Sequence, residues 1–98
     1  MDAYEIVLKP RAVADMDGLR KYYATQIADA MEKHLQHEPT KVSKTRIKRL
    51  RGIRNPDYRL RVGKFRVFDT VDDASSQVSV LRVMHKDDTQ QYYEELQR

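Results

Sequence analysis

A run of alternating residues between positions 57 and 69 limits this chain to folds that contain an antiparallel hairpin. It reads D-Y-R-L-R-V-G-K-F-R-V-F-D, with apolar residues and basic residues alternating on both sides of Gly63-Lys64. Successive side chains of a strand point to opposite faces of a sheet, so one face of the hairpin is apolar and the other carries guanidinium groups. The pattern predicts strands at 57–62 and 65–72 with a tight turn between them.

The rest of the chain predicts a two-layer α+β fold. In chain order the expected elements are a strand at 4–8, a helix at 10–16, a longer helix from Leu19 to a point before Pro39, a loop or partly ordered connection at 38–56, strands at 57–62, 65–72 and 77–84, and a short helix or tail at 87–97. This order, β-α-α-β-β-β and then a short α, predicts an antiparallel sheet with a helical hairpin on one face. The other face is expected to be open to solvent. Leu50 and Ile53 are expected to anchor the connection, and Asp87 or Asp88 to cap the last helix.

The length and composition favour one domain that spans residues 1–98. A chain of 98 residues can bury one modest core, and the absence of cysteine excludes disulfides and thiolate metal sites. No stretch approaches the roughly 20 apolar residues of a membrane span, and the N-terminus lacks the features of a signal peptide. We therefore expect a cytoplasmic protein without a membrane partner.

The basic residues are concentrated in one part of the chain. Residues 41–66 hold eleven of the nineteen Lys and Arg residues and only one acid, Asp57, although the net charge of the whole chain is only +4. Such segregation is typical of a site for a polyanion or an acidic protein.

Arg59, Arg61 and Arg66 fall on adjacent strands of the predicted hairpin, and Lys86 and Tyr92 follow the last strand. Arginine forks match phosphate oxygens, so an open sheet face lined with arginines can hold a nucleic-acid backbone. Tyr92 and Tyr93 can add a stacking platform or a phenol for proton transfer. The alternative is that the arginine row is only a soluble face.

Other kinds of site find little support in the sequence. His34 and His37 share a helical face, but no cysteine or carboxylate trio accompanies them, so no metal site is expected. The chain has no Gly-rich phosphate loop, nucleophile elbow or HExxH motif, and therefore no cofactor is expected.

Several motifs together resemble those of the RelE/ParE superfamily of bacterial toxins from type II toxin-antitoxin systems. They are L-R-G-I at Leu50–Ile53, D-Y-R-L-R-V, G-K-F-R-V-F, and V-M-H-K-D-D-T-Q-Q-Y-Y near the C-terminus. The resemblance covers nearly the whole chain in the order of elements. It implies a small antiparallel sheet with two helices packed on one side, in agreement with the predicted architecture.

The resemblance to the RelE branch implies a metal-independent endoribonuclease that cuts messenger RNA in the ribosomal A site, with contacts to 16S ribosomal RNA. In that reaction the ribose 2′-hydroxyl attacks the neighbouring phosphate, and fixed cations stabilise the charge that develops on the phosphate oxygens. The resemblance places catalytic positions at Arg59, Arg61, Arg66, Lys86 and Tyr92. It also implies a heteromeric complex with a cognate antitoxin.

The chain differs from the best-known RelE pattern at some of these positions. Arg59 and Arg61 stand where lysines are usual, and arginine is a poor general base because its pKa is above about 12. Lys86 stands where an arginine is usual, and His85 precedes it. We therefore assign phosphate binding to the arginines, a second positive charge to Lys86, and proton transfer to His85 or Tyr92.

Seven further basic residues are expected to contact RNA. They are Lys44, Arg46, Lys48, Arg49, Arg51, Arg54 and Lys64. Two alternatives to the nuclease remain: a ParE-like inhibitor of DNA gyrase without a nuclease site, and a catalytically inactive family member that only binds its antitoxin.

Overall fold

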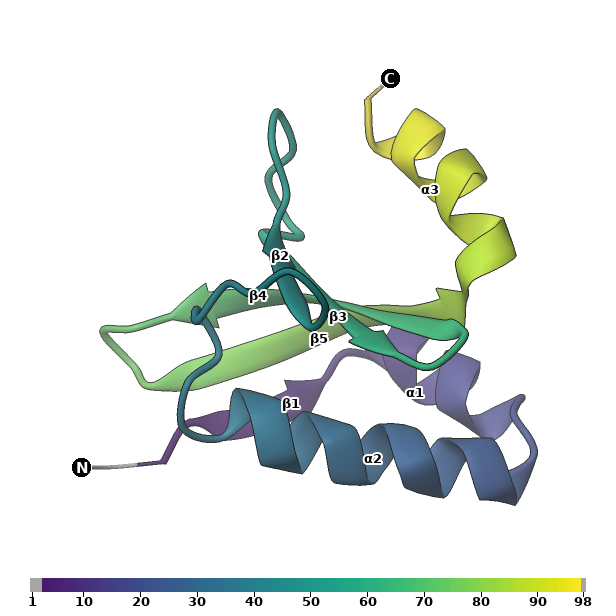
Figure 1. Ribbon diagram of the computed structural model, residues 1–98, viewed down its shortest axis with the longest axis horizontal. Coiled ribbons are helices and arrows are strands. Elements are labelled where there is room, and N and C mark those ends of the chain that lie inside the picture. Colours follow the sequence, from purple (N-terminus) through teal and green to yellow (C-terminus); the bar gives the residue numbers. More distant parts are fainter. Residues whose placement is uncertain (1–2, 98) are drawn as a thin grey trace.

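The structure, a computed structural model, describes residues 3–97 and contains a five-stranded sheet with helices on both faces (Figure 1). The elements in chain order are β1 (Glu5–Leu8), α1 (Pro10–Asp17), α2 (Lys21–Leu35), β2 (Ile47–Arg49), β3 (Tyr58–Val62), β4 (Phe65–Asp72), β5 (Gln77–His85), a short 3-10 helix (Lys86–Asp88) and α3 (Thr89–Leu96). Across the sheet the strands lie in the order β1-β5-β4-β3-β2. The predicted α+β class and the order of its main elements are confirmed.

The strands β3, β4 and β5 form the predicted antiparallel meander. One strand direction differs from the expectation: β1 runs parallel to β5, from Glu5 opposite Gln77 to Leu8 opposite Val80. The direction of this pairing depends on the path of the chain through α1 and α2, which separate β1 from the rest of the sheet in the sequence. A local sequence pattern therefore cannot predict it. The sheet is therefore mixed at the β1 edge.

The connection at 38–56 is more ordered than a loop. Its residues Ile47–Arg49 form β2, which pairs antiparallel with β3 and places Ile47 opposite Leu60. Ile47 is buried, and this single apolar side chain on an otherwise basic segment gives the strand a place in the core. Leu50 and Ile53 pack together in a second cluster, as expected of anchors for this segment.

The two predicted helices cover one face of the sheet. Pro10 occupies the first turn of α1, where its missing N–H costs nothing, and residues 18–20 separate α1 from α2. Ala12 from α1 and Ile27, Met31 and Leu35 from α2 are buried against the strands. This packing fixes which side of the β3–β4 hairpin faces the core.

The other face of the sheet is partly covered, and the expectation of a fully open face is wrong. Phe68 and Met84 point away from α1 and α2 and form a small core with Tyr92 of α3 and Leu50. In Figure 1, α3 stands on the opposite side of the sheet from α2. The apolar residues of this short helix are too few for the sequence to predict that it covers this face.

The predicted cap of the last helix also differs in its detail. Asp88 occupies the N-cap position of α3 without a side-chain capping bond. Instead, the N–H of Asp87 donates to Nδ1 of His85 at 3.1 Å, and the Thr89 hydroxyl donates to the carbonyl of Lys86 at 2.7 Å. Among the described residues, no helix is long and apolar enough to cross a membrane.

Candidate functional site

Four basic side chains project from one face of the sheet, on the side away from α1 and α2. Arg61 and Arg66 lie directly opposite each other on β3 and β4, and Lys48 lies opposite Arg59 on β2 and β3. Directly opposed residues of an antiparallel pair share one face. We call this group, Lys48, Arg59, Arg61 and Arg66, the cationic face.

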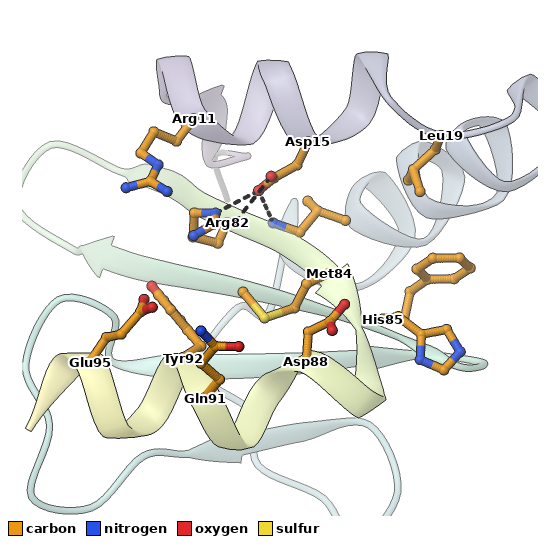
Figure 2. A pocket seen from close by; sticks show the side chains of 12 residues that line it. Arg11, Asp15, Leu19, Arg82, Met84, His85, Asp88, Gln91, Tyr92 and Glu95 are labelled. Carbon is orange, nitrogen blue, oxygen red and sulfur yellow. Dashed lines mark hydrogen bonds and ion pairs between the residues drawn. The ribbon is translucent and has the colours of Figure 1, made fainter.

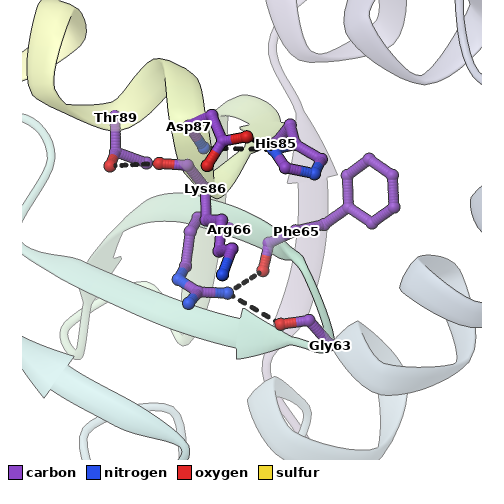
Figure 3. A network of polar contacts seen from close by, with 7 residues as sticks. All are labelled: Gly63, Phe65, Arg66, His85, Lys86, Asp87 and Thr89. Carbon is purple, nitrogen blue, oxygen red and sulfur yellow. Dashed lines mark hydrogen bonds and ion pairs between the residues drawn. The ribbon is translucent and has the colours of Figure 1, made fainter.

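Arg66 is held in place by the hairpin turn. Its Nη1 donates to the carbonyls of Gly63 and Phe65, each at 2.9 Å (Figure 3). Partial burial lowers the pKa of Arg66, and the charges of Arg59 and Arg61 lower it further. Both bonds use a single nitrogen, so the remaining N–H groups of the guanidinium stay available to an anion.

The Nε atom of Arg59 lacks a hydrogen-bond acceptor among the described residues. This nitrogen is also buried. A buried donor without a partner costs roughly 1–3 kcal/mol. An anionic oxygen bound on the cationic face would reduce the repulsion among its arginines.

Lys86 and His85 end on different sides of the sheet. The N–H of Lys86 donates to the carbonyl of Lys64 at 2.7 Å, and the Lys86 side chain extends towards Arg66 in Figure 3. His85 lies opposite Phe65 and packs edge-on against its ring, on the side of the sheet that faces α2. The structure therefore brings Lys86, but not His85, to the cationic face.

The two tyrosines of α3 also have different surroundings. Tyr92 is buried, its ring lies 4.9 Å from Phe68, and burial raises the pKa of its hydroxyl. Tyr93 is only partly buried: its ring lies 5.8 Å from that of Phe68, and it lines a small cavity together with Lys48 of the cationic face. Tyr93 therefore lies beside the cationic face, and Tyr92 belongs to the buried cluster. The sequence predicts that both tyrosines lie near this surface, but it does not predict which of them α3 turns towards the core.

The seven residues expected to contact RNA do not form one surface. Lys48 belongs to the cationic face, and Lys64 lies in the β3–β4 turn beside it. Arg49 lies 5.1 Å from the ring centroid of Tyr58, on the other face. Arg46 donates to the carbonyl of Arg61 at 3.1 Å and lines a small cavity with His34. The remaining three, which are exposed in the connection around β2, are Lys44, Arg51 and Arg54.

A separate groove lies between α1 and α3 and has a volume of about 440 Å³ (Figure 2). Asp15 of α1 lies in it and accepts three bonds: from Arg82 Nε at 2.7 Å, from Arg82 Nη2 at 3.2 Å and from the N–H of Val83 at 2.9 Å. A carboxylate whose oxygens are satisfied in this way joins two elements rather than acting on a substrate. In the described part of the chain, no group of three His, Cys, Asp or Glu residues could hold a metal ion.

Comparisons with known proteins identify relatives of the whole fold. A family model described as the ParE toxin of the type II toxin-antitoxin system parDE matches residues 6–89. In the toxin-antitoxin complex RelBE2 from Mycobacterium tuberculosis, one chain is 26% identical with a TM-score of 0.75, and the match covers 87% of this chain and 93% of that chain. A comparison with curated protein sequences finds no match.

Two more distant structures share the fold. The isolated E. coli RelE toxin is 21% identical with a TM-score of 0.69, and the match covers 98% of each chain. The archaeal RelE-RelB complex from Pyrococcus horikoshii is 23% identical over 85% of this chain and 94% of that chain, also with a TM-score of 0.69. Over the matched residues, this chain and these two structures have the same fold.

Proposed function

This chain belongs to the ParE toxin family of type II toxin-antitoxin systems, within the RelE/ParE superfamily, and from that premise we propose that it is a metal-independent endoribonuclease that cuts messenger RNA on the ribosome. The observation that carries the proposal is the cationic face. Arg59, Arg61 and Arg66 lie together there on β3 and β4, and partial burial together with the charges of Arg59 and Arg61 lowers the pKa of Arg66. Such an arrangement favours an anion whose charge increases during a reaction.

The chemistry that suits this face is an internal transfer of a phosphate group. The 2′-oxygen of a ribose bonds to the adjacent phosphorus, and the bond from phosphorus to the 5′-oxygen breaks. The 2′-hydroxyl loses a proton, the 5′-oxygen gains one, and a 2′,3′-cyclic phosphate and a 5′-hydroxyl remain. Negative charge builds on the phosphate oxygens in between, and guanidinium groups already held in position stabilise it without reorganising.

Arg66 has the central role in this proposal because the turn carbonyls of Gly63 and Phe65 hold its guanidinium in position. Arg59 and Arg61 share the phosphate charge, and Lys86 supplies a further positive charge at the end of β5. Arginine is a poor base, and His85 lies on the other side of the sheet. We therefore move the assignment of proton transfer from His85 or Tyr92 to the phenol of Tyr93.

A complex with an antitoxin is part of the same proposal. The structures from M. tuberculosis and P. horikoshii are complexes of toxin and antitoxin proteins. An acidic segment of an antitoxin would compete with RNA for the basic residues of positions 41–66, which would keep this chain inactive.

The second candidate function is inhibition of DNA gyrase, because the matching family model is named for ParE toxins. A catalytically inactive member that binds only its antitoxin is a third, and arginines at the usual lysine positions favour it. The three differ in what they do to ribosomes and to gyrase.

One experiment separates the three functions. The purified protein is incubated with ribosomes translating a defined messenger RNA, and separately with gyrase and relaxed plasmid. Our proposal predicts RNA breaks within A-site codons and normal supercoiling. Loss of supercoiling with intact RNA would support the gyrase inhibitor, and no effect in either assay would support the inactive member.

A further inference from the structure

Four aromatic rings form a continuous row on the α2 side of the sheet, around the end of the β3–β4 hairpin. The ring centroids lie 5.2 Å apart for Tyr22 and Tyr23, 5.3 Å for Tyr23 and Phe65, and 5.8 Å for Phe65 and His85. We call this row, Tyr22, Tyr23, Phe65 and His85, the aromatic row. It joins residues from α2, β4 and β5, so only the folded chain assembles it.

Packing of the core does not account for the two tyrosines of this row. Tyr22 is 66% exposed and Tyr23 is 38% exposed, and neither belongs to the two apolar clusters of the protein. A cavity of about 550 Å³ opens beside them and is also lined by Gln26 and Lys64. This volume lies within the range of about 300–1,000 Å³ that is usual for small-ligand sites.

The cavity lies next to the turn that holds Arg66. Gly63 lines the cavity, and the carbonyl of the same residue accepts the bond from Arg66 Nη1. Lys64, also in the lining, brings a positive charge to the rim. A chain of phosphates that lies on Arg66 therefore has a path around the turn to the aromatic row, with a cation beside it.

His85 can recognise a polar edge at this place. Its Nδ1 accepts the N–H of Asp87, so in the neutral ring the proton is on Nε2, which is then a donor. The amide of Gln26 can both donate and accept. Flat aromatic faces next to such groups are suited to a nucleobase, because every base has a face for stacking and an edge with donors and acceptors.

We propose that the aromatic row binds the unpaired base of a nucleotide next to the phosphate that lies on Arg66. This inference rests on the proposed function, since it takes the ligand to be single-stranded RNA. The base enters the cavity and stacks on Tyr23, with Tyr22 covering it from the solvent side. The row thereby fixes which phosphate of the strand reaches the cationic face.

The test measures binding of short single-stranded RNAs by fluorescence anisotropy, with 2′-O-methyl groups to prevent cleavage. One RNA is intact, and the others each lack one base at a successive position. The protein variants are Tyr23→Ala, Arg66→Ala and Val42→Ala, and the last removes an exposed apolar side chain outside the aromatic row. Circular dichroism confirms that each variant is folded.

We expect Tyr23→Ala to weaken binding of the intact RNA about 10-fold, or about 1.4 kcal/mol, because the variant loses the stacking of one base on an aromatic side chain. For one abasic RNA the wild type and Tyr23→Ala should bind equally, because the stacking partner is already missing. Val42→Ala should bind every RNA as the wild type does.

Two results would overturn the inference and leave the proposed function standing, provided that Arg66→Ala still weakens binding of all RNAs. One is unchanged binding by Tyr23→Ala, as expected if the aromatic row faces a protein. The other is an equal loss on every abasic RNA. If the wild type binds no RNA even at low salt, the inference is contradicted, and cleavage of messenger RNA on translating ribosomes then decides the proposed function separately.

Discussion

Asp69 is a buried carboxyl group on the face of β4 that packs against α1 and α2. It lies between Val67 and Val71 in the alternation of the strand, opposite Tyr58 on β3. Neither of its oxygens has a hydrogen-bond partner among the described residues. Burial, with a smaller effect of Asp57, raises the pKa of Asp69 from 3.8 to about 8.

The raised pKa of Asp69 predicts a loss of stability as the pH rises. Between pH 3.8 and about pH 8 the unfolded chain has released this proton and the folded chain keeps it. Folding therefore takes up a proton, and the contribution of Asp69 to the free energy of unfolding, fully present below pH 3.8, is lost by about pH 8.

We predict that Asp69→Asn removes this part of the pH dependence. Denaturant unfolding at pH 5 and pH 8 should show the variant gaining stability relative to the wild type as the pH rises. Asp29→Asn, an exposed position on α2, serves as the control and should follow the wild type. Parallel pH curves for Asp69→Asn and the wild type would contradict the assignment.

The neighbouring tyrosines of α3 give a second prediction for single residues. Tyr93→Phe should lower the rate of RNA cleavage at least 10-fold without changing the thermal midpoint, because Tyr93 lines a cavity that Lys48 of the cationic face also lines. Tyr92→Phe should leave the rate unchanged, since the ring of Tyr92 packs on Phe68 inside the small core. The reverse outcome would return the catalytic assignment to Tyr92.

Among the elements, α1 has a role that its sequence does not reveal. β1 pairs with β5 only up to Val80, and beyond that point α1 lies along the edge of β5. There the Asp15 carboxylate accepts the N–H of Val83 and pairs with Arg82. The helix thereby protects a strand edge that would otherwise expose unpaired groups.

Removal of this contact should destabilise the protein. Both side chains of the pair are about one-fifth exposed, at 21% for Arg82 and 18% for Asp15. We predict that Asp15→Ala lowers the free energy of unfolding by about 3 kcal/mol, as is typical when one partner of a largely buried pair is lost. Asp17→Ala, an exposed change on the same helix, should cost less than about 0.5 kcal/mol in the same denaturant titration.

The elements also show how far the sequence predicts the fold. The period of two in β3 and β4 correctly places Leu60 in the core and Arg59 and Arg61 on the other face, because alternation is a local property. The parallel direction of β1 and the position of α3 depend on contacts between distant segments. The buried position of Asp69 could have been predicted, because this residue interrupts the apolar side of an alternating strand.

At the scale of the whole molecule, the basic residues of positions 41–66 divide between two faces and an edge. Four of them, Lys48, Arg59, Arg61 and Arg66, gather on the cationic face. The site therefore holds fewer phosphates than the number of basic residues alone would indicate.

Salt dependence measures how many phosphates the protein contacts. Each phosphate neutralised on a single strand contributes about −0.7 to the slope of log affinity against log salt, so the four residues of the cationic face together with Lys86 predict a slope of about −3.5. The slope is measured by fluorescence anisotropy with single-stranded RNA at salt concentrations from about 50 to about 200 mM, where the affinity of phosphate-binding proteins changes strongly. A slope near zero would contradict a site dominated by phosphate, and one near −8 would implicate the whole basic segment.

The most direct test of the central claim compares two arginine variants in a purified translation system. Arg66→Ala removes the guanidinium that the turn carbonyls hold on the cationic face, and Arg54→Ala removes an equal charge from an exposed loop. The measured quantity is the rate of messenger RNA cleavage in the ribosomal A site. We predict a loss of about 100-fold or more for Arg66→Ala and less than about 3-fold for Arg54→Ala. Equal rates for the two variants would contradict the claim that the cationic face is the catalytic site.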